Sequence, residues 1–256
     1  MDTPVHIQHA PSHIVATYRN EKMVLPQAVQ ERIDRFWMAE VSRGKKLTRG
    51  PVFAVHQYEQ MKDGTHIQLA NTDYAHYLYT ITNKDFVSSP YACRVVHTAA
   101  LVQTLDHCFV IGEMASHNAH ANRLQLVAGG LDTVDINDGH VDFKRSIVRE
   151  LNEEVGISLS HIQRIESKYL KTGGDFGSIV LIFDVQLRTK ANELQKQYHE
   201  YTFQLLKQGE KPEFSDLLTI QRESNVIKQF IHNDPRKKVD YLIPILEMAT
   251  SPHSLI

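Results

Sequence analysis

Three glutamates in one short segment are the residues whose types and spacing could carry chemistry. Glu150, Glu153 and Glu154 lie in the run R-E-L-N-E-E-V-G-I, which begins at Arg149. On a helix, positions i, i+3 and i+4 are neighbours, so the three carboxylates would share one face. Like charges at this separation repel unless a cation binds, and hard divalent cations such as Mg2+ take carboxylate oxygens as ligands. The alternative is a solvated acidic face, because glutamate-rich helix ends are common.

The segment from Phe143 to Val155 has the pattern of the helix that would position these carboxylates. Asp142 precedes it as the N-cap, and Gly156 follows it where a left-handed residue ends a helix. An apolar stripe recurs every four residues: Phe143, Ile147, Leu151 and Val155.

A glycine pair precedes this helix. The mostly apolar run 124–127 leads to Gly129 and Gly130, and a loop then connects them to Asp142. Strand, glycine pair, loop and carboxylate-bearing helix form an order that is typical of a phosphate-metal site. This order favours the functional interpretation over the solvated face.

The run R-E-L-x-E-E-V-G-I resembles the second half of the Nudix hydrolase signature, G-x5-E-x7-R-E-U-x-E-E-x-G-U, in which U is aliphatic. The tail matches in full, but the front departs. Val141 stands where the signature has its upstream glutamate, and Asp135 where it has glycine. Gly130 takes the glycine position only if the loop 131–141 carries about five extra residues.

The resemblance implies a Nudix-like α/β/α sandwich with a mixed sheet and hydrolysis of a diphosphate by water. It also implies Mg2+ or Mn2+ as the cofactor. Its ligands would be the carboxylates of Glu150, Glu153 and Glu154 and the main-chain carbonyl of Gly129.

The catalytic roles follow from the same resemblance. Arg149 is expected to orient a carboxylate within the helix rather than to touch the substrate. The general base is either Glu150 or a residue of a later loop, for which Glu213 is the candidate by its order in the chain.

The N-terminal part resembles the branch of Nudix proteins related to UDP-sugar pyrophosphatases, through Phe36-Trp37, Gly50–Phe53 and Thr72–Leu78. This second resemblance makes a nucleotide sugar such as a UDP-sugar the first candidate substrate. ADP-ribose or a dinucleotide is the alternative. A nucleotide-binding module without turnover is a third hypothesis, motivated by Val141. The aromatic run 74–79 is expected to pack the extension onto the main domain rather than to stack on a base.

The loop 131–141 does not read as a calcium loop, because aligning Gly139 as the sixth residue leaves Val134 and Ile136 at ligand positions. We expect this insertion to project outward, with solvated aspartates at Asp132, Asp135 and Asp138.

The composition excludes several classes of protein. The chain has 256 residues and a formal net charge of −2, which argues against a basic nucleic-acid surface. Its two cysteines make no disulfide framework, and no signal peptide or membrane-spanning run is evident. We therefore expect a cytoplasmic enzyme that acts on a small molecule.

The remaining patterns predict an N-terminal α+β extension over residues 1–92 and the hydrolase domain over residues 93–256. In the extension we expect an early strand near 13–18, a helix ending near 42 and a hairpin around Asp63-Gly64. In the main domain we expect strands at 98–104, 108–114, 123–127, 164–170, 178–187 and 217–221, and helices at 191–206, 224–231 and 241–248.

Overall fold

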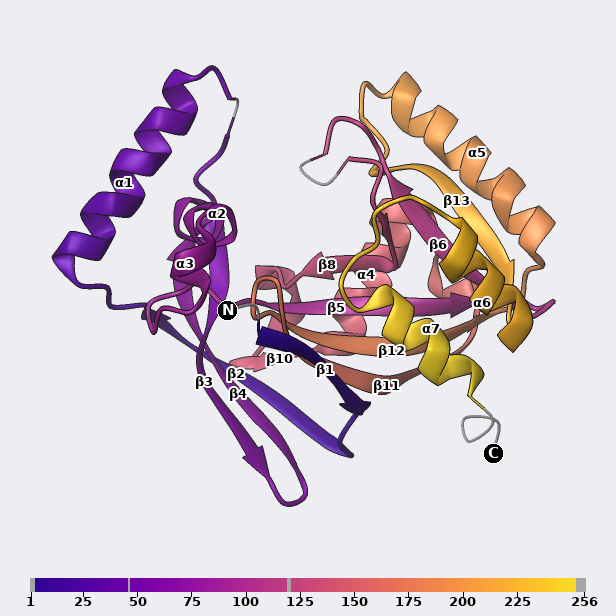
Figure 1. Ribbon diagram of the computed structural model, residues 1–256, viewed down its shortest axis with the longest axis horizontal. Coiled ribbons are helices and arrows are strands. Elements are labelled where there is room, and N and C mark those ends of the chain that lie inside the picture. The colour runs from indigo at the N-terminus through magenta and orange to yellow at the C-terminus, as the bar shows by residue number, and fades with distance from the viewer. Residues whose placement is uncertain (1–2, 46, 119–120, 252–256) are drawn as a thin grey trace.

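The computed structural model describes residues 3–45, 47–118 and 121–251. An eight-stranded mixed sheet forms its centre (Figure 1). The main path runs β1-β11-β12-β5-β6-β13, with β7 paired to β6 and β8 paired to β5. These strands are β1 (Thr3–His9), β5 (Val96–Gln103), β6 (Cys108–Met114), β7 (Leu124–Gln125), β8 (Val127–Gly130), β11 (Ile162–Gly174), β12 (Ile179–Leu187) and β13 (Phe214–Gln221).

Helices cover both faces of this sheet. The helices are α4 (Phe143–Val155), α5 (Ala191–Lys207), α6 (Ser224–Asn233) and α7 (Leu242–Thr250). Successive residues of a strand point to opposite faces. In β5, Ala100 and Val102 accordingly join the core under α4 and α5, whereas Ala99 and Leu101 join the core under α6 and α7. The predicted class, an α/β/α sandwich with a mixed sheet, is confirmed.

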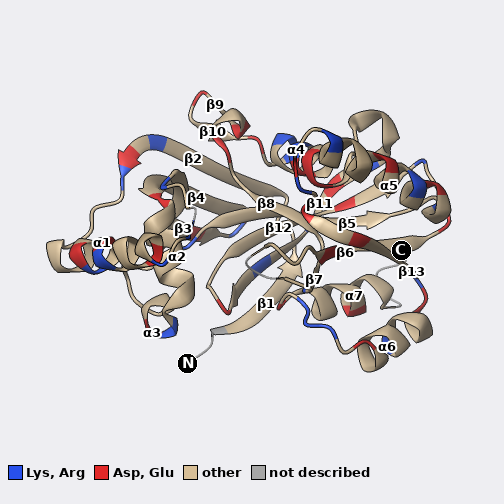
Figure 2. Cartoon of the chain, turned by 90° about the horizontal axis from the view of Figure 1, so that it is seen from above, with Lys and Arg blue, Asp and Glu red and all other residues tan. Residues whose placement is uncertain are grey.

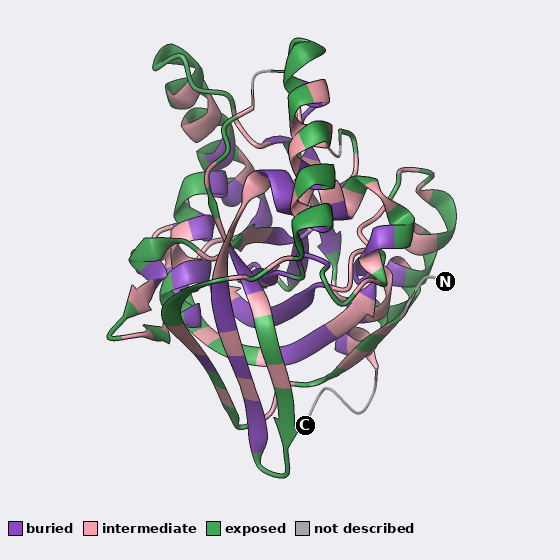
Figure 3. Ribbon diagram, turned by 90° about the vertical axis from the view of Figure 1, so that its left-hand side faces the viewer, coloured by how far each residue is buried: buried purple, intermediate pink, exposed green. Residues whose placement is uncertain are grey.

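A second, five-stranded sheet has the order β3-β4-β2-β10-β9. Its strands are β2 (His13–Lys22), β3 (Pro51–Met61), β4 (Gly64–Asp73), β9 (Ile136–Asn137) and β10 (His140–Val141). β3 and β4 form the predicted hairpin, and β3 is mostly exposed at the edge of the sheet, whereas β4 is largely buried (Figure 3). The helices of this part are α1 (Gln27–Ser42), α2 (Tyr74–Thr82) and α3 (Lys84–Val87).

Two segments join the N-terminal part to the rest of the molecule. β1, which was not predicted, is the edge strand beside β11 in the large sheet. β10 comes from the loop before α4 and pairs with β2 through His140 and Thr17. The domain division at residues 92/93 stays a prediction.

Most of the remaining predicted elements are observed, with shifted ends. β2 continues several residues past the predicted end of its strand, and β13 begins several residues before its predicted start. The expected pairing of 98–104 with 108–114 is confined to the end of β5, at Val102 and Gln103, because β8 pairs with its first half. None of the helices in the described ranges has the length and apolar character needed to span a bilayer.

Candidate active site

Helix α4 has the N-cap, the C-terminal glycine and the buried apolar stripe that its sequence predicted. The side chain of Asp142 accepts a hydrogen bond from the Arg145 amide at 2.9 Å, and Gly156 ends the helix with a φ of 70°. The apolar stripe is buried, so the helix lies against β8 and β5 with its acidic residues in its last two turns (Figure 2). A hydrogen bond of 3.0 Å between the hydroxyls of Thr98 and Ser146 adds a polar tie to β5.

Gly129, at the end of β8, lies directly against Glu150. A Cβ atom built on Gly129 would be 2.1 Å from Cδ and Oε1 of Glu150 and 2.3 Å from Oε2. Real Cβ atoms do not approach other atoms so closely. The absence of a side chain at Gly129 therefore allows the Glu150 carboxyl group to lie against the strand.

The carboxyl groups of Glu150 and Glu154 are both buried. Oε2 of Glu154 accepts a hydrogen bond from the Ala128 amide at 3.2 Å. Burial raises the pKa of Glu154 well above its usual value, and the charges of Glu213 and Glu150 raise it further. Burial also raises the pKa of Glu150 to about 7. The positive charge of Arg149 opposes this increase, and the charges of Glu153 and Glu213 add to it.

Glu213 reaches this site from the residue immediately before β13. Its charge contributes to the raised pKa of both Glu150 and Glu154, and burial raises its own pKa. Its main-chain carbonyl accepts hydrogen bonds from the Ala115 amide at 2.9 Å and from Nδ2 of Asn118 at 2.8 Å. The fold thus brings three carboxyl groups from two distant segments to one place.

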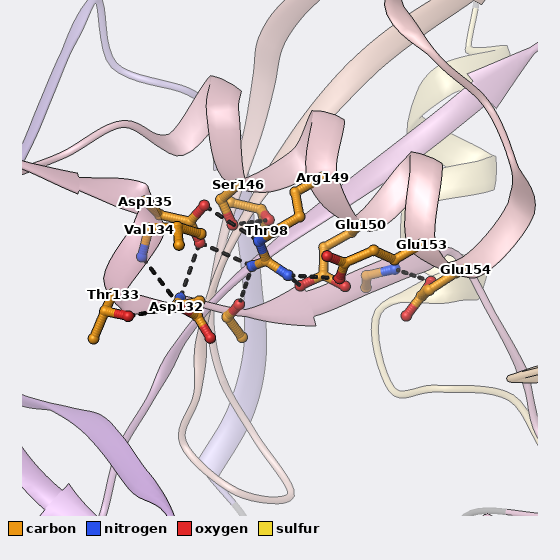
Figure 4. A network of polar contacts seen from close by, with 12 residues as sticks. Thr98, Asp132, Thr133, Val134, Asp135, Ser146, Arg149, Glu150, Glu153 and Glu154 are labelled. Atoms are coloured by element: carbon orange, nitrogen blue, oxygen red, sulfur yellow. Dashed lines mark hydrogen bonds and ion pairs between the residues drawn. The ribbon is translucent and has the colours of Figure 1, made fainter. Parts of the chain in front are cut away.

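Arg149 binds carboxylates of its own helix and of the loop that precedes it (Figure 4). Its guanidinium lies 2.8 Å from Glu150, 3.0 Å from Glu153 and 2.8 Å from Asp135, and it donates to the carbonyl of Gly130 at 3.0 Å. Glu153 is half exposed at this contact, with 56% of its side chain accessible. Arg149 therefore links the helix, the strand end and the loop.

The prediction that the loop aspartates are all solvated is wrong for Asp135, whose side chain is fully buried. Asp132 and Asp138 are exposed, as expected. Asp132 caps the short helix η1 (Thr133–Asp135), and Asp135 accepts from the Asp132 amide at 2.9 Å in return. The same carboxylate binds Arg149, and β10 pairs with β2. These contacts fold the loop onto the protein.

The carboxylate and main-chain carbonyl oxygens at this site are of the kind that binds a hard divalent cation. Carboxylate oxygens and a main-chain carbonyl are ligands of Mg2+ and Mn2+. A divalent cation would also counteract the burial and the mutual repulsion that raise the pKa of Glu150 and Glu154. Over residues 3–45, 47–118 and 121–251, no three His, Cys, Asp or Glu side chains already converge as a metal cage. Glu153 in particular is engaged with Arg149.

A pocket of about 220 Å³ opens beside the carboxylates. Its polar lining includes Arg123, His97 and Glu213, and Gly129 and Gly130 form part of its wall. Burial lowers the pKa of His97 to about 4, and the charge of Lys171 contributes, so the imidazole is neutral near pH 7.

A second pocket of about 160 Å³ adjoins the first and shares Tyr77, His97 and Gly130 with it. Much of its lining is apolar or aromatic and comes from the N-terminal extension: Pro51, Val52, Phe53, Tyr74 and Tyr77. Tyr77 also contacts the small core around Cys93, so the aromatic run packs the extension and faces a pocket as well. The two volumes together fall within the roughly 300–1,000 Å³ of small-molecule sites.

Comparison with known proteins gives likenesses of structure alone. No family model matches the sequence, and no curated protein matches it. DR0079 from Deinococcus radiodurans is similar with 11% identity and a TM-score of 0.45, over 79% of this chain and all of that one.

Two further solved structures are similar to parts of the chain. The bifunctional NMN adenylyltransferase/ADP ribose pyrophosphatase from Francisella tularensis, complexed with AMP and a manganese ion, has 16% identity and a TM-score of 0.42, over 68% of this chain and 46% of that one. The Nudix domain of NrtR from Shewanella oneidensis, complexed with ADP ribose, has 11% identity and a TM-score of 0.37, over 70% of this chain and 97% of that one. At these values the likenesses establish no function for this chain.

Proposed function

We propose that this protein is a divalent-metal-dependent hydrolase of the Nudix type, which cleaves the diphosphate bond of a nucleoside diphosphate linked to another group. The observation that carries the proposal is the meeting of Glu150, Glu154 and Glu213 beside the main chain of Gly129, at the edge of a pocket. Burying carboxyl groups together is costly in the absence of a cation. A structural role alone gives no reason for this arrangement.

Glu150, Glu153, Glu154 and the carbonyl of Gly129 are the groups that would hold Mg2+ or Mn2+. When bound, the metal ion would stabilise the negative charge that develops on the phosphoryl oxygens during attack by water. Glu153 would have to turn away from Arg149 to contribute an oxygen, and its half-exposed side chain is free to do so. Arg149 would then hold Glu150 through the contact at 2.8 Å.

Two carboxylates are candidates for the general base that takes a proton from the attacking water. Burial raises the pKa of Glu213 and of Glu150, which brings both closer to neutral pH, where a general base is most effective. Glu213 forms no hydrogen bond through its carboxyl group within the described residues. It also lines the pocket, so it is the candidate that is free to contact water there.

The adjoining aromatic pocket supports a substrate with a ring system attached to the diphosphate. Tyr74 and Tyr77 have ring centroids 5.9 Å apart, and Tyr77 belongs to both pockets. Stacking of a base on an aromatic side chain contributes about 1–3 kcal/mol. Tyr74→Ala should therefore raise KM for a nucleotide substrate about 5- to 150-fold, whereas Tyr74→Phe should retain most of the affinity. Equal KM values for the two variants would contradict a ring-binding role.

The substrate is distinguished by a panel assayed with Mg2+ and with Mn2+. UDP-sugars are the first candidates, and ADP-ribose and dinucleotides are the alternatives. Release of a nucleoside monophosphate identifies the cleaved bond. Folded protein that turns over no diphosphate with either metal refutes the enzymatic proposal. In that case, binding of a nucleotide without turnover would support the non-catalytic hypothesis motivated by Val141.

A further inference from the structure

Arg123 has no counterion among the residues that the structure describes. Its guanidinium forms no ion pair with any residue in the described part of the chain, and its Nε atom is buried without a hydrogen-bond partner. A buried donor that has lost its hydration and gained no hydrogen bond destabilises the protein. The backbone around Arg123 is fixed, since its carbonyl accepts the Met114 amide at 2.9 Å and the next residue begins β7.

A second cation near this pocket, Lys171, is buried and neutralised. Nζ of Lys171 lies 3.2 Å from Oδ2 of Asp240 and 3.1 Å from the hydroxyl of Ser178. Burial lowers the pKa of Lys171, and the positive charge of Arg123 lowers it further, so the two cations lie within electrostatic reach of each other. Asp240 offsets the charge of Lys171, whereas no ion pair within the described residues offsets the charge of Arg123.

The position of Arg123 indicates what would offset it. Arg123 lines the same 220 Å³ pocket as Gly129 and Glu213, yet it forms no ion pair with Glu213. A guanidinium presents parallel N–H donors that match the oxygens of a phosphate, and such charge-assisted hydrogen bonds are strong. An anion in this pocket would satisfy the buried Nε and lie next to the carboxylate site.

We propose that Arg123 is an anion anchor that binds a phosphate group of the ligand inside this pocket. That this phosphate belongs to a cleavable diphosphate rests on the proposed function, whereas the anion site itself does not. Bound there, the phosphate would place its diphosphate bond beside Glu213 and the metal-binding carboxylates.

The direct test is equilibrium binding of inorganic pyrophosphate and of a nucleoside monophosphate, measured by calorimetry with Mg2+ and again with EDTA. Arg123→Gln should weaken the binding of both probes at least about tenfold, because hydrogen bonds to charged groups contribute about 1.5–3 kcal/mol. Arg123→Lys, which keeps the charge but loses the fork of donors, should weaken binding less. The melting temperature of Arg123→Gln should hold or rise, since an unsatisfied donor is removed.

Arg94→Gln is the matched control. Arg94 is also an arginine without an ion pair among the described residues, but it lines a separate pocket with Val55 and Tyr58. Its replacement removes the same charge and should leave binding of both probes unchanged. Equal losses in the two glutamine variants would indicate a general effect of charge and overturn the proposal. Wild-type affinity in Arg123→Gln, or no binding by the wild-type protein in either condition, would overturn it too.

Binding and turnover separate this inference from the proposed function. A protein that hydrolyses nothing but binds pyrophosphate through Arg123 retains the anion site and loses the enzymatic proposal. A protein that hydrolyses a diphosphate with unchanged KM and kcat in Arg123→Gln retains the enzymatic proposal and loses the anion site.

Discussion

Replacing Gly129 by alanine tests the central contact of the candidate site. The added methyl group would lie 2.1 Å from the Cδ and Oε1 atoms of Glu150, far inside the roughly 3.5–4.0 Å of an ordinary contact. The carboxyl group is the far end of a flexible side chain, so it can move away, but it must move by more than about 1 Å to make room for the methyl group. A shift of this size in a reacting group can reduce activity about 100-fold.

Stability should respond far less than activity to this change. Moving a carboxylate to solvent relieves its burial, and Gly→Ala at a compatible position stabilises by about 0.4–1 kcal/mol through the unfolded chain. We therefore expect the melting temperature of Gly129→Ala to stay within about 4 °C of the wild type. Its kcat/KM and its affinity for Mn2+, measured by paramagnetic resonance titration, should both fall sharply.

The neighbouring glycine provides the comparison. A Cβ atom on Gly130 would meet nothing closer than Nδ1 of His97 at 4.0 Å, so Gly130→Ala should lose at most a few-fold in kcat/KM. The double variant Gly129→Ala/Glu150→Asp should recover part of the Mn2+ affinity, because the shorter side chain makes room for the methyl group. Wild-type activity and metal affinity in Gly129→Ala would refute the argument that Glu150 must lie against this strand.

Two further predictions concern the charged groups around Arg149. In the folded, metal-free protein the pKa of Glu150 is raised from 4.5 to about 7 and that of Glu154 is raised as well, so the folded state binds more protons than the unfolded state in this window. Its free energy of unfolding in EDTA should therefore decrease as the pH rises from about 4.5 to 7. Glu154→Gln should make this decrease smaller and should also lower turnover. If denaturant titrations give the variant the same dependence of unfolding free energy on pH as the wild type, the reasoning is contradicted. Asp135→Asn should lower the free energy of unfolding by about 1–3 kcal/mol, because it weakens a buried contact to Arg149. Asp138→Asn should stay within about 0.5 kcal/mol, since Asp138 is exposed and asparagine tolerates its φ of 47°, and equal losses would show that burial of Asp135 is not the cause.

The sequence by itself determined helix α4 and its surroundings, because the interactions that define them are local. The cap at Asp142, the left-handed Gly156 and the stripe from Phe143 to Val155 involve residues within a few positions of one another. The same holds for the hairpin of β3 and β4, whose turn follows from Asp63-Gly64. Local spacing therefore fixed which residues share the acidic face.

The tertiary structure alone decided which distant groups complete the site. Asp135 could have been found as a partner of Asp132 from the D-x-x-D spacing of a capping box, but its burial depends on Arg149 and on the pairing of β10 with β2. The sequence placed Glu213 in a later loop, and only the packing of β13 against β6 brings it beside the carboxylates.

Two further features could not be predicted from the sequence. Arg123 has no counterion among the described residues, and Tyr74 and Tyr77 form an aromatic wall of a pocket. The charge of a side chain can be read from its residue type, but whether an opposite charge stands next to it depends on segments far away in the chain. For Arg123, that question is decided by residues of β8, of the turn between β11 and β12, and of the segment before α7, which line one pocket only after the chain has folded.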